Sequence, residues 1–150
     1  MSTELSTLYQ ELILDHNRHP RNFRVIDNPS AQAQGFNPIC GDKLTVYLQL
    51  VDSIIVDLSF LGCGCAISQS SASLMTEALR GKTIDEARQL FTSFHNLVTG
   101  SSDNDSDRMG SKLAVFRTVS AYPARVKCAT LAWHTLQAAL NKDSESVSTE

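Results

Sequence analysis

The residues of this chain best suited to chemistry are its four cysteines, which lie in three separate segments. Cys40 stands alone, Cys63 and Cys65 form a close pair, and Cys128 follows far downstream. Asp42, two residues after Cys40, adds a carboxylate oxygen to the set. Three thiolates with one carboxylate suit a tetrahedral Zn²⁺ site, and a set of thiolates also suits an iron–sulfur cluster. The spacing of the cysteines leaves both kinds of metal site open.

A β-hairpin is the element expected to bring the first three cysteines together. Apolar and polar residues alternate over 44–50 and again over 54–60, with a short polar turn between the two runs. This pattern predicts two antiparallel strands with one buried face. Because the start of one strand of a hairpin lies beside the end of the other, Cys40 is expected close to Cys63 and Cys65.

The surroundings of the last two cysteine segments favour thiolates. Cys65 opens a predicted helix, where the free N–H groups and the helix dipole attract negative charge. Cys128 lies near the start of the last predicted helix, with Arg125 and Lys127 close to it in sequence. We expect these two cations to lower the pKa of the Cys128 thiol below its usual value of about 8.5.

Two other interpretations of the cysteines remain open from the residues alone. They could be ordinary small core residues, although cysteines in glycine-rich loops at strand ends are not typical of a core. Cys63 and Cys65 could instead form a redox pair, which would leave Cys40 and Cys128 unexplained.

The pattern of elements predicts an α+β fold. A helix ended by Pro20 comes first, the hairpin follows, and several helices occupy the rest of the chain. Such segregation is typical of a small antiparallel sheet, here of about three strands, with helices packed mainly on one face. The expected further elements are an edge strand near 31–36 and helices over 67–78, 84–98, 113–122 and 129–139. We expect one domain over 1–140 and a polar, disordered tail over 141–150.

Composition sets the class of protein. The chain has 150 residues, 42% hydrophobic and 19% charged, with a formal net charge of -3. The negative charge argues against a nucleic-acid partner, and no apolar run reaches the roughly 18 residues that cross a membrane. With no secretory signal in the sequence, we expect a cytoplasmic protein, in which reduced cysteines act as ligands or nucleophiles rather than disulfide partners.

Three motifs in order resemble the IscU/NifU-like iron–sulfur cluster assembly family. The resemblance runs from about Tyr9 to Leu140. It is most similar to the SufU branch, because Lys127 stands where scaffold-type members carry a histidine and the stretch before it is long. The matching motifs are Cys40-Gly41-Asp42, Gly64-Cys65-Ala66-Ile67-Ser68 and Lys127-Cys128.

The resemblance implies a zinc-dependent sulfurtransferase in iron–sulfur cluster biogenesis. In that family pattern Zn²⁺ would be held by Cys40, Asp42, Cys65 and Cys128. Cys40 would accept persulfide sulfur from a SufS-type, pyridoxal-phosphate cysteine desulfurase and relay it to downstream assembly proteins. Arg125 matches a SufU arginine and is expected to steady the thiolate or persulfide, or to contact the partner.

The same cysteines leave two other functions open. One is an IscU-type scaffold that assembles and transfers an iron–sulfur cluster, against which the lysine at 127 counts. The other is a structural zinc module for protein contacts. Cys63 departs from the family pattern and could be a spare ligand, a second sulfur acceptor or an inert thiol.

Overall fold

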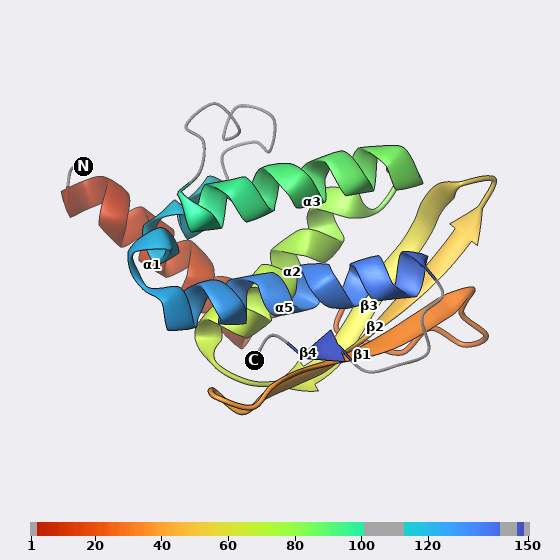
Figure 1. Cartoon of the computed structure of the whole chain (residues 1–150), viewed down its shortest axis with the longest axis horizontal. Helices are drawn as coiled ribbons and strands as arrows, with labels where there is room; N and C mark the ends of the chain where they lie inside the picture. Colours follow the sequence, from red (N-terminus) through yellow and green to blue (C-terminus); the bar gives the residue numbers. More distant parts are fainter. Residues whose placement is uncertain (1–2, 101–112, 142–146, 149–150) are drawn as a thin grey trace.

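The computed structural model describes residues 3–100, 113–141 and 147–148, and it places the helices on one face of a β-sheet (Figure 1). This is the α+β arrangement that the sequence predicts. The elements in chain order are α1 (Thr3–Arg18), β1 (Ala31–Asn37), β2 (Asp42–Val51), β3 (Ile54–Cys63), α2 (Ala66–Leu79), α3 (Ile84–Thr99), the 3₁₀ helix η1 (Leu113–Ala121), α5 (Pro123–Leu140) and β4 (Val147–Ser148). Within these residues, no helix is both long and apolar enough to span a membrane.

The sheet has the strand order β3-β2-β1-β4. The first three strands are antiparallel, as expected, while β4 adds a short parallel pairing to β1. The predicted tail therefore contributes Val147 and Ser148 to the sheet, and its remaining residues from 142 on lie outside the described ones. Residues 101–112, in the long stretch that precedes Lys127, also lie outside the described residues.

The predicted β2–β3 hairpin is confirmed. The conformation of its two turn residues allows a turn this short. Asp52 and Ser53 both have positive φ values, 52° and 64°. Two such residues characterise the type I′ turn, whose twist matches that of the strands it joins. The register that follows sets Lys43 opposite Cys63 at the far end of the hairpin.

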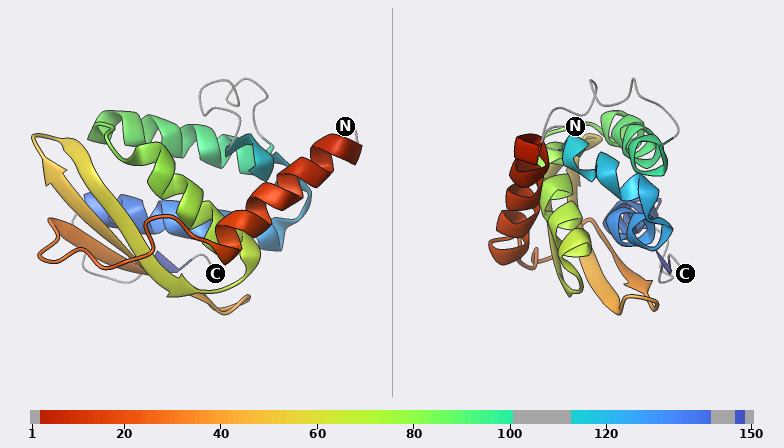
Figure 2. Two further views of the ribbon diagram at one scale, coloured as in Figure 1. Left: turned by 180° about the vertical axis from the view of Figure 1, so that it is seen from behind. Right: turned by 90° about the vertical axis from the view of Figure 1, so that its left-hand side faces the viewer.

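Helix α5 lies across the middle of the sheet and contacts β1 and β2, while α2 covers β3 and α1 flanks α2 (Figure 2). Alternate residues of β2 are buried beneath these helices: Leu44, Val46 and Leu48 are at most 3% exposed. A Cβ on Gly35 would run into the Thr135 hydroxyl of α5. Glycine at this position therefore allows α5 to approach the sheet closely.

An aromatic cluster joins α5 to α3 and η1. The Trp133 ring stacks on Phe94 at 4.5 Å between centroids, and Phe94 meets Phe116 edge-on at 5.7 Å. The buried indole N–H of Trp133 donates to the Ser71 hydroxyl at 3.1 Å, so it keeps a partner.

The fourth helix expected over 113–122 is instead a 3₁₀ helix. The buried residues Leu113, Phe116 and Val119 recur every third position. That spacing matches the three residues per turn of a 3₁₀ helix rather than the 3.6 of an α-helix. The predicted helix is therefore present, and its geometry is that of a 3₁₀ helix.

Gly35→Ala should destabilise the fold by about 1–3 kcal/mol, the usual cost of overpacking a core. The added methyl group has to displace the Thr135 hydroxyl. Adding Thr135→Ala to this variant removes that hydroxyl and should recover part of the loss. Urea unfolding of the two single variants and the double variant measures the coupling. Simple additivity of the two changes would contradict the close approach.

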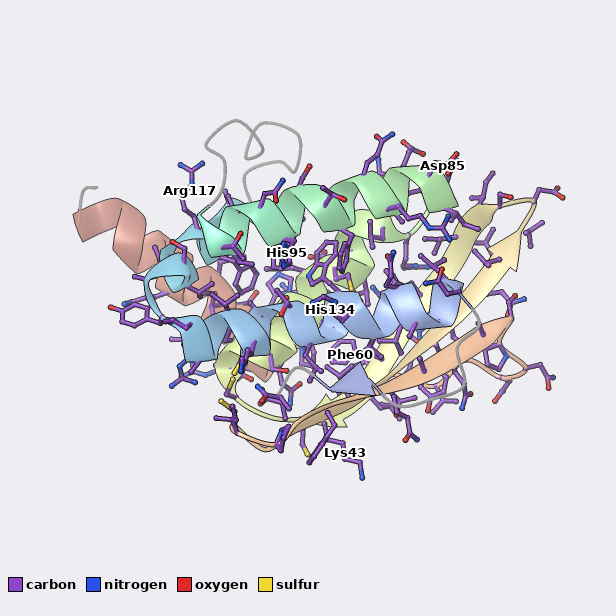
Figure 3. All side chains as sticks on the ribbon, in the orientation of Figure 1. Lys43, Phe60, Asp85, His95, Arg117 and His134 are labelled. Atoms are coloured by element: carbon purple, nitrogen blue, oxygen red, sulfur yellow. The ribbon has the colours of Figure 1, made fainter. Side chains whose placement is uncertain are left out.

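His134 links stability to pH at the α3–α5 seam. It meets Phe91 edge-on at 5.2 Å and lies 6.2 Å from the His95 ring (Figure 3). Burial, and next the neighbouring His95, lower the pKa of His134. A histidine with a lowered pKa in the folded state binds its proton more readily in the unfolded chain, so stability should fall as the pH drops below about 6.5.

His134→Gln should make the loss of stability between pH 7.5 and 5.5 shallower, because the variant lacks the histidine whose pKa is lowered on folding. Urea unfolding across this range tests it against the parent protein. Above pH 7.5 the two profiles should run parallel. Equal slopes below pH 6.5 would show that protonation of His134 is not coupled to folding.

Candidate metal centre

The loop between β1 and β2 carries Cys40. Asn37 and Asp42 face each other at the ends of the two strands, and the loop of residues 38–41 closes the hairpin. Gly41 has a φ of 73°, a left-handed conformation that glycine adopts without strain. The loop leaves Cys40 partly exposed, whereas the Asp42 carboxylate is fully buried beneath it.

The turn from β3 into α2 places Cys65 against this loop. Cys65 is the N-cap of α2, and its backbone N–H donates to Asp42 Oδ1 at 2.8 Å. A Cβ on Gly64 would collide with the same carboxylate, so glycine makes room for it. This hydrogen bond between the two strand ends agrees with the proximity that the hairpin predicts.

Helix α5 supplies the third cysteine. Pro123 occupies the first turn, where its missing N–H has no partner to lose, and Cys128 follows on the face that meets the sheet. Cys128 is fully buried, and its Sγ lies 3.2 Å from Cys40 Sγ. Figure 3 shows sulfur atoms gathered beside the first turns of α5, at the end of the sheet away from the β2–β3 turn.

A compact set of possible metal ligands results. Single ligand atoms of Cys40, Asp42 and Cys128 all lie within 4.8 Å of one another. Cys65 stands just outside that set, with its Sγ 4.0 Å from Asp42 Oδ2. These side chains offer three sulfurs and one oxygen, a donor set that suits tetrahedral Zn²⁺.

Arg125 brings one positive charge to this set of cysteines and Asp42. Arg125 is exposed at the start of α5, and its pKa is raised chiefly by Cys65, then by Cys128 and Cys40, so its guanidinium faces all three sulfurs. If all three thiols lose their protons to bind a metal ion, one guanidinium cannot balance their charge and that of the buried carboxylate. A divalent cation among these ligands would supply the missing positive charge.

The expected lowering of the Cys128 pKa is wrong. Burial is the largest influence and raises the pKa of this thiol, and hydrogen bonds to Cys40 and Asp42 act in the same direction. The cation at Arg125 faces Cys128 from the solvent side and does not outweigh the loss of hydration. Without a metal ion, Cys128 therefore stays a neutral thiol.

Two other residues with ligand-type side chains lie away from this set. Cys63 is exposed at the end of β3, opposite Lys43, and does not belong to the compact group. His16, a possible ligand by type, is buried against α2, where Nδ1 lies 2.7 Å from Ser73 Oγ and Nε2 lies 3.5 Å from Glu77.

Sequence analysis missed Asn37. Its side chain is fully buried, and its Nδ2 group donates to Asp42 Oδ2 at 3.3 Å and to Cys128 Sγ at 3.5 Å. The available signal was its place directly across the hairpin from Asp42.

Comparison with known proteins agrees with the resemblance found in the motifs. The family described as the NifU-like N terminal domain matches residues 8–129. The zinc-dependent sulfurtransferase SufU of Bacillus subtilis is 39% identical over 95% of this chain and 95% of its own length. The iron–sulfur cluster assembly scaffold protein IscU of Thermotoga maritima is 36% identical over 91% of this chain and 95% of its own.

Solved structures give the same result. An iron–sulfur cluster assembly scaffold protein for the SUF system, from Fervidobacterium islandicum AW-1, superposes with a TM-score of 0.83 at 35% identity, covering 93% of this chain and 99% of that one. A NifU-like protein from Brucella abortus reaches a TM-score of 0.82 at 23% identity, over 92% of this chain and 95% of its own, which supports the fold alone. With its motifs, fold and relatives in agreement, the chain belongs to the NifU-like N-terminal domain family of iron–sulfur cluster assembly proteins, within which it resembles SufU.

Proposed function

We propose that this protein is a zinc-dependent sulfurtransferase that accepts persulfide sulfur from a SufS-type cysteine desulfurase and relays it to iron–sulfur cluster assembly. The observation that carries the proposal is the contact of Cys40 and Cys128, 3.2 Å apart, beside the buried Asp42. The SufU relative from Bacillus subtilis, a zinc-dependent sulfurtransferase, supports it. Residues 1–140 would form the single domain that does this work.

The proposed ligands are Cys40, Asp42, Cys65 and Cys128. Bound Zn²⁺ would keep the thiols deprotonated and protect them from oxidation. Asp42 suits a permanent ligand, because its carboxylate is held by the Cys65 backbone N–H and by the Asn37 side chain. A small turn of the Cys65 side chain would complete the set from its place beside Asp42 Oδ2.

Cys40 is the proposed sulfur acceptor. It lies on a loop and is partly exposed, unlike Cys128 on its helix. The Cys40 thiolate attacks the terminal sulfur of the persulfide on the desulfurase. A new S–S bond forms at Cys40 as the old one breaks, and the electron pair leaves with the desulfurase cysteine as a thiolate. Sulfur moves with no net oxidation or reduction, so the step needs no further reagent.

Arg125 and two exposed apolar residues are suited to the partner surface. The Arg125 guanidinium faces the sulfurs from the solvent side, where it can pair with an incoming persulfide. Ile39 is 61% exposed beside Cys40, and Tyr122 is 64% exposed at the N-cap of α5. Apolar side chains around a charged centre are typical of the core of a protein interface.

An iron–sulfur scaffold is the second candidate. The match to the IscU relative favours it, and the same thiols would serve. Lys127, where scaffold-type members have a histidine, removes one imidazole ligand from that set. Anaerobic reconstitution with iron and sulfide separates the two: a stable chromophore whose iron passes to an apo-ferredoxin supports the scaffold.

Cys40→Ala should abolish the stimulation of sulfide release that the parent protein gives a SufS-type desulfurase, which we expect to be many-fold. The variant lacks the thiolate that attacks the persulfide. Cys63→Ala is the matched control, because Cys63 is exposed and outside the compact set, and it should keep most of the stimulation. Absence of stimulation by the parent protein would refute the sulfurtransferase.

The purified protein should contain one zinc ion per chain by elemental analysis. Asp42→Ala and Cys128→Ser should each lower the zinc content strongly, because each removes a buried ligand, while Cys63→Ser should keep it. The apparent zinc affinity of the parent should rise with pH, since each thiol ligand releases a proton on binding. Full zinc content in Cys128→Ser would refute the ligand set.

A further inference from the structure

Asn37 occupies a position with two neighbours from the candidate metal centre. It is the last residue of β1, directly opposite Asp42, and its side chain is 0% exposed. Its amide group lies between the first residue of β2 and Cys128 of α5. A polar side chain buried this fully needs hydrogen-bond partners to be tolerated.

The orientation of the Asn37 amide follows from those neighbours. Nδ2 donates to Asp42 Oδ2 at 3.3 Å and to Cys128 Sγ at 3.5 Å. Both acceptors are anionic when they bind a metal, so the NH₂ group and not the carbonyl must face them. The carbonyl oxygen Oδ1 is buried and has no partner in the described part of the chain.

The Asn37 amide thus donates to two candidate metal ligands, whereas its carbonyl oxygen is left without a hydrogen bond in the described residues. A buried acceptor without a partner costs about 1–3 kcal/mol, so an apolar residue of similar size would be the better choice for stability alone. An amide that persists at such a position points to a role at the ligands that it contacts. Hydrogen bonds to metal ligands fix their orientation and tune the metal.

The contacts divide the ligands into two kinds. Asp42 and Cys128 are both fully buried and both accept from the same amide. Cys40 is partly exposed on the loop of residues 38–41. We propose that Asn37 is a positioning residue that restrains Asp42 and Cys128 as lasting metal ligands and so leaves Cys40 as the thiol that is free to leave and accept sulfur. The second half of this statement rests on the proposed sulfurtransferase function, and the first half does not.

The test replaces Asn37 with an apolar residue of roughly equal size. In Asn37→Leu, zinc affinity measured by competition with a chromophoric chelator should fall about 10–100-fold, the usual effect of losing such a contact. In the Co²⁺-substituted protein, the thiolate-to-cobalt charge-transfer band should shift, because Cys128 no longer accepts an N–H bond. Thr130→Val is the matched control: it removes a nearly buried hydroxyl two residues beyond Cys128 and should leave both readouts unchanged.

Alkylation of the zinc-loaded protein tests the selection of Cys40. With limiting iodoacetamide, peptide mass spectrometry should find Cys40 modified well ahead of Cys128 in the parent. The ratio of Cys40 alkylation to Cys128 alkylation should fall several-fold in Asn37→Leu, since Cys128 is no longer restrained. Should Asn37→Leu fail to fold, Asn37→Ser, whose hydroxyl is too short to reach both acceptors, replaces it in all three measurements.

The outcomes are separable. If the charge-transfer band and the zinc affinity of Asn37→Leu match those of Thr130→Val, the positioning role is wrong and Asn37 is only a packing residue. An unchanged alkylation preference would overturn the selection of Cys40. If the parent fails to stimulate a desulfurase while the affinity and the band respond to Asn37→Leu, the sulfurtransferase falls and the positioning of Asp42 and Cys128 stands.

Discussion

The buried carboxylate of Asp42 is the constraint around which the metal centre is arranged. It accepts from the Cys65 backbone at 2.8 Å and from the Asn37 side chain at 3.3 Å, with no exposure to water. A carboxylate removed from water is tolerated only where hydrogen bonds and opposite charge replace its hydration. The two donors come from the end of β1 and the start of α2, so the folding of the sheet and the solvation of Asp42 depend on each other.

The same lack of hydration explains the raised pKa of the Cys128 thiol. Burial raises the pKa of Cys128 even though an arginine lies near it, since the loss of water outweighs one exposed cation. Its proton is held in the contact with Cys40. A metal ion that binds to Cys128 would have to displace this proton.

Much of this could be predicted from the sequence, because the signals are periodic or local. The period-two pattern over 44–60 predicts the hairpin, and a hairpin has to bring its two ends together, which is why Cys40 was expected close to Cys63 and Cys65. Two of the glycines beside the thiols, Gly62 and Gly64, are explained by close contacts that a Cβ would block.

The features that sequence analysis missed depend on three-dimensional burial. The pKa of Cys128 follows from its full burial on α5, which neighbouring residues in the sequence, such as Lys127, do not reveal. Asn37 precedes a proline in a loop-like stretch and has no periodic signal, yet it acts through a residue on the opposite strand and another on α5. The 3₁₀ geometry of η1 was visible as a three-residue spacing, but apolar spacings of three and four are both typical of α-helices.

The proposed ligands lie on parts of the fold that differ in how firmly the core holds them. Two of its members, Asp42 and Cys128, sit on a strand and a helix that the core holds in place, with Leu44 beside one and Ala129 beside the other, both buried. The other two, Cys40 and Cys65, sit where the chain turns. A ligand on a loop can move without disturbing the core, whereas moving Cys128 would require α5 to shift on the sheet. The proposed ligands are therefore divided between positions that the core holds in place and positions on turns, which can move more easily.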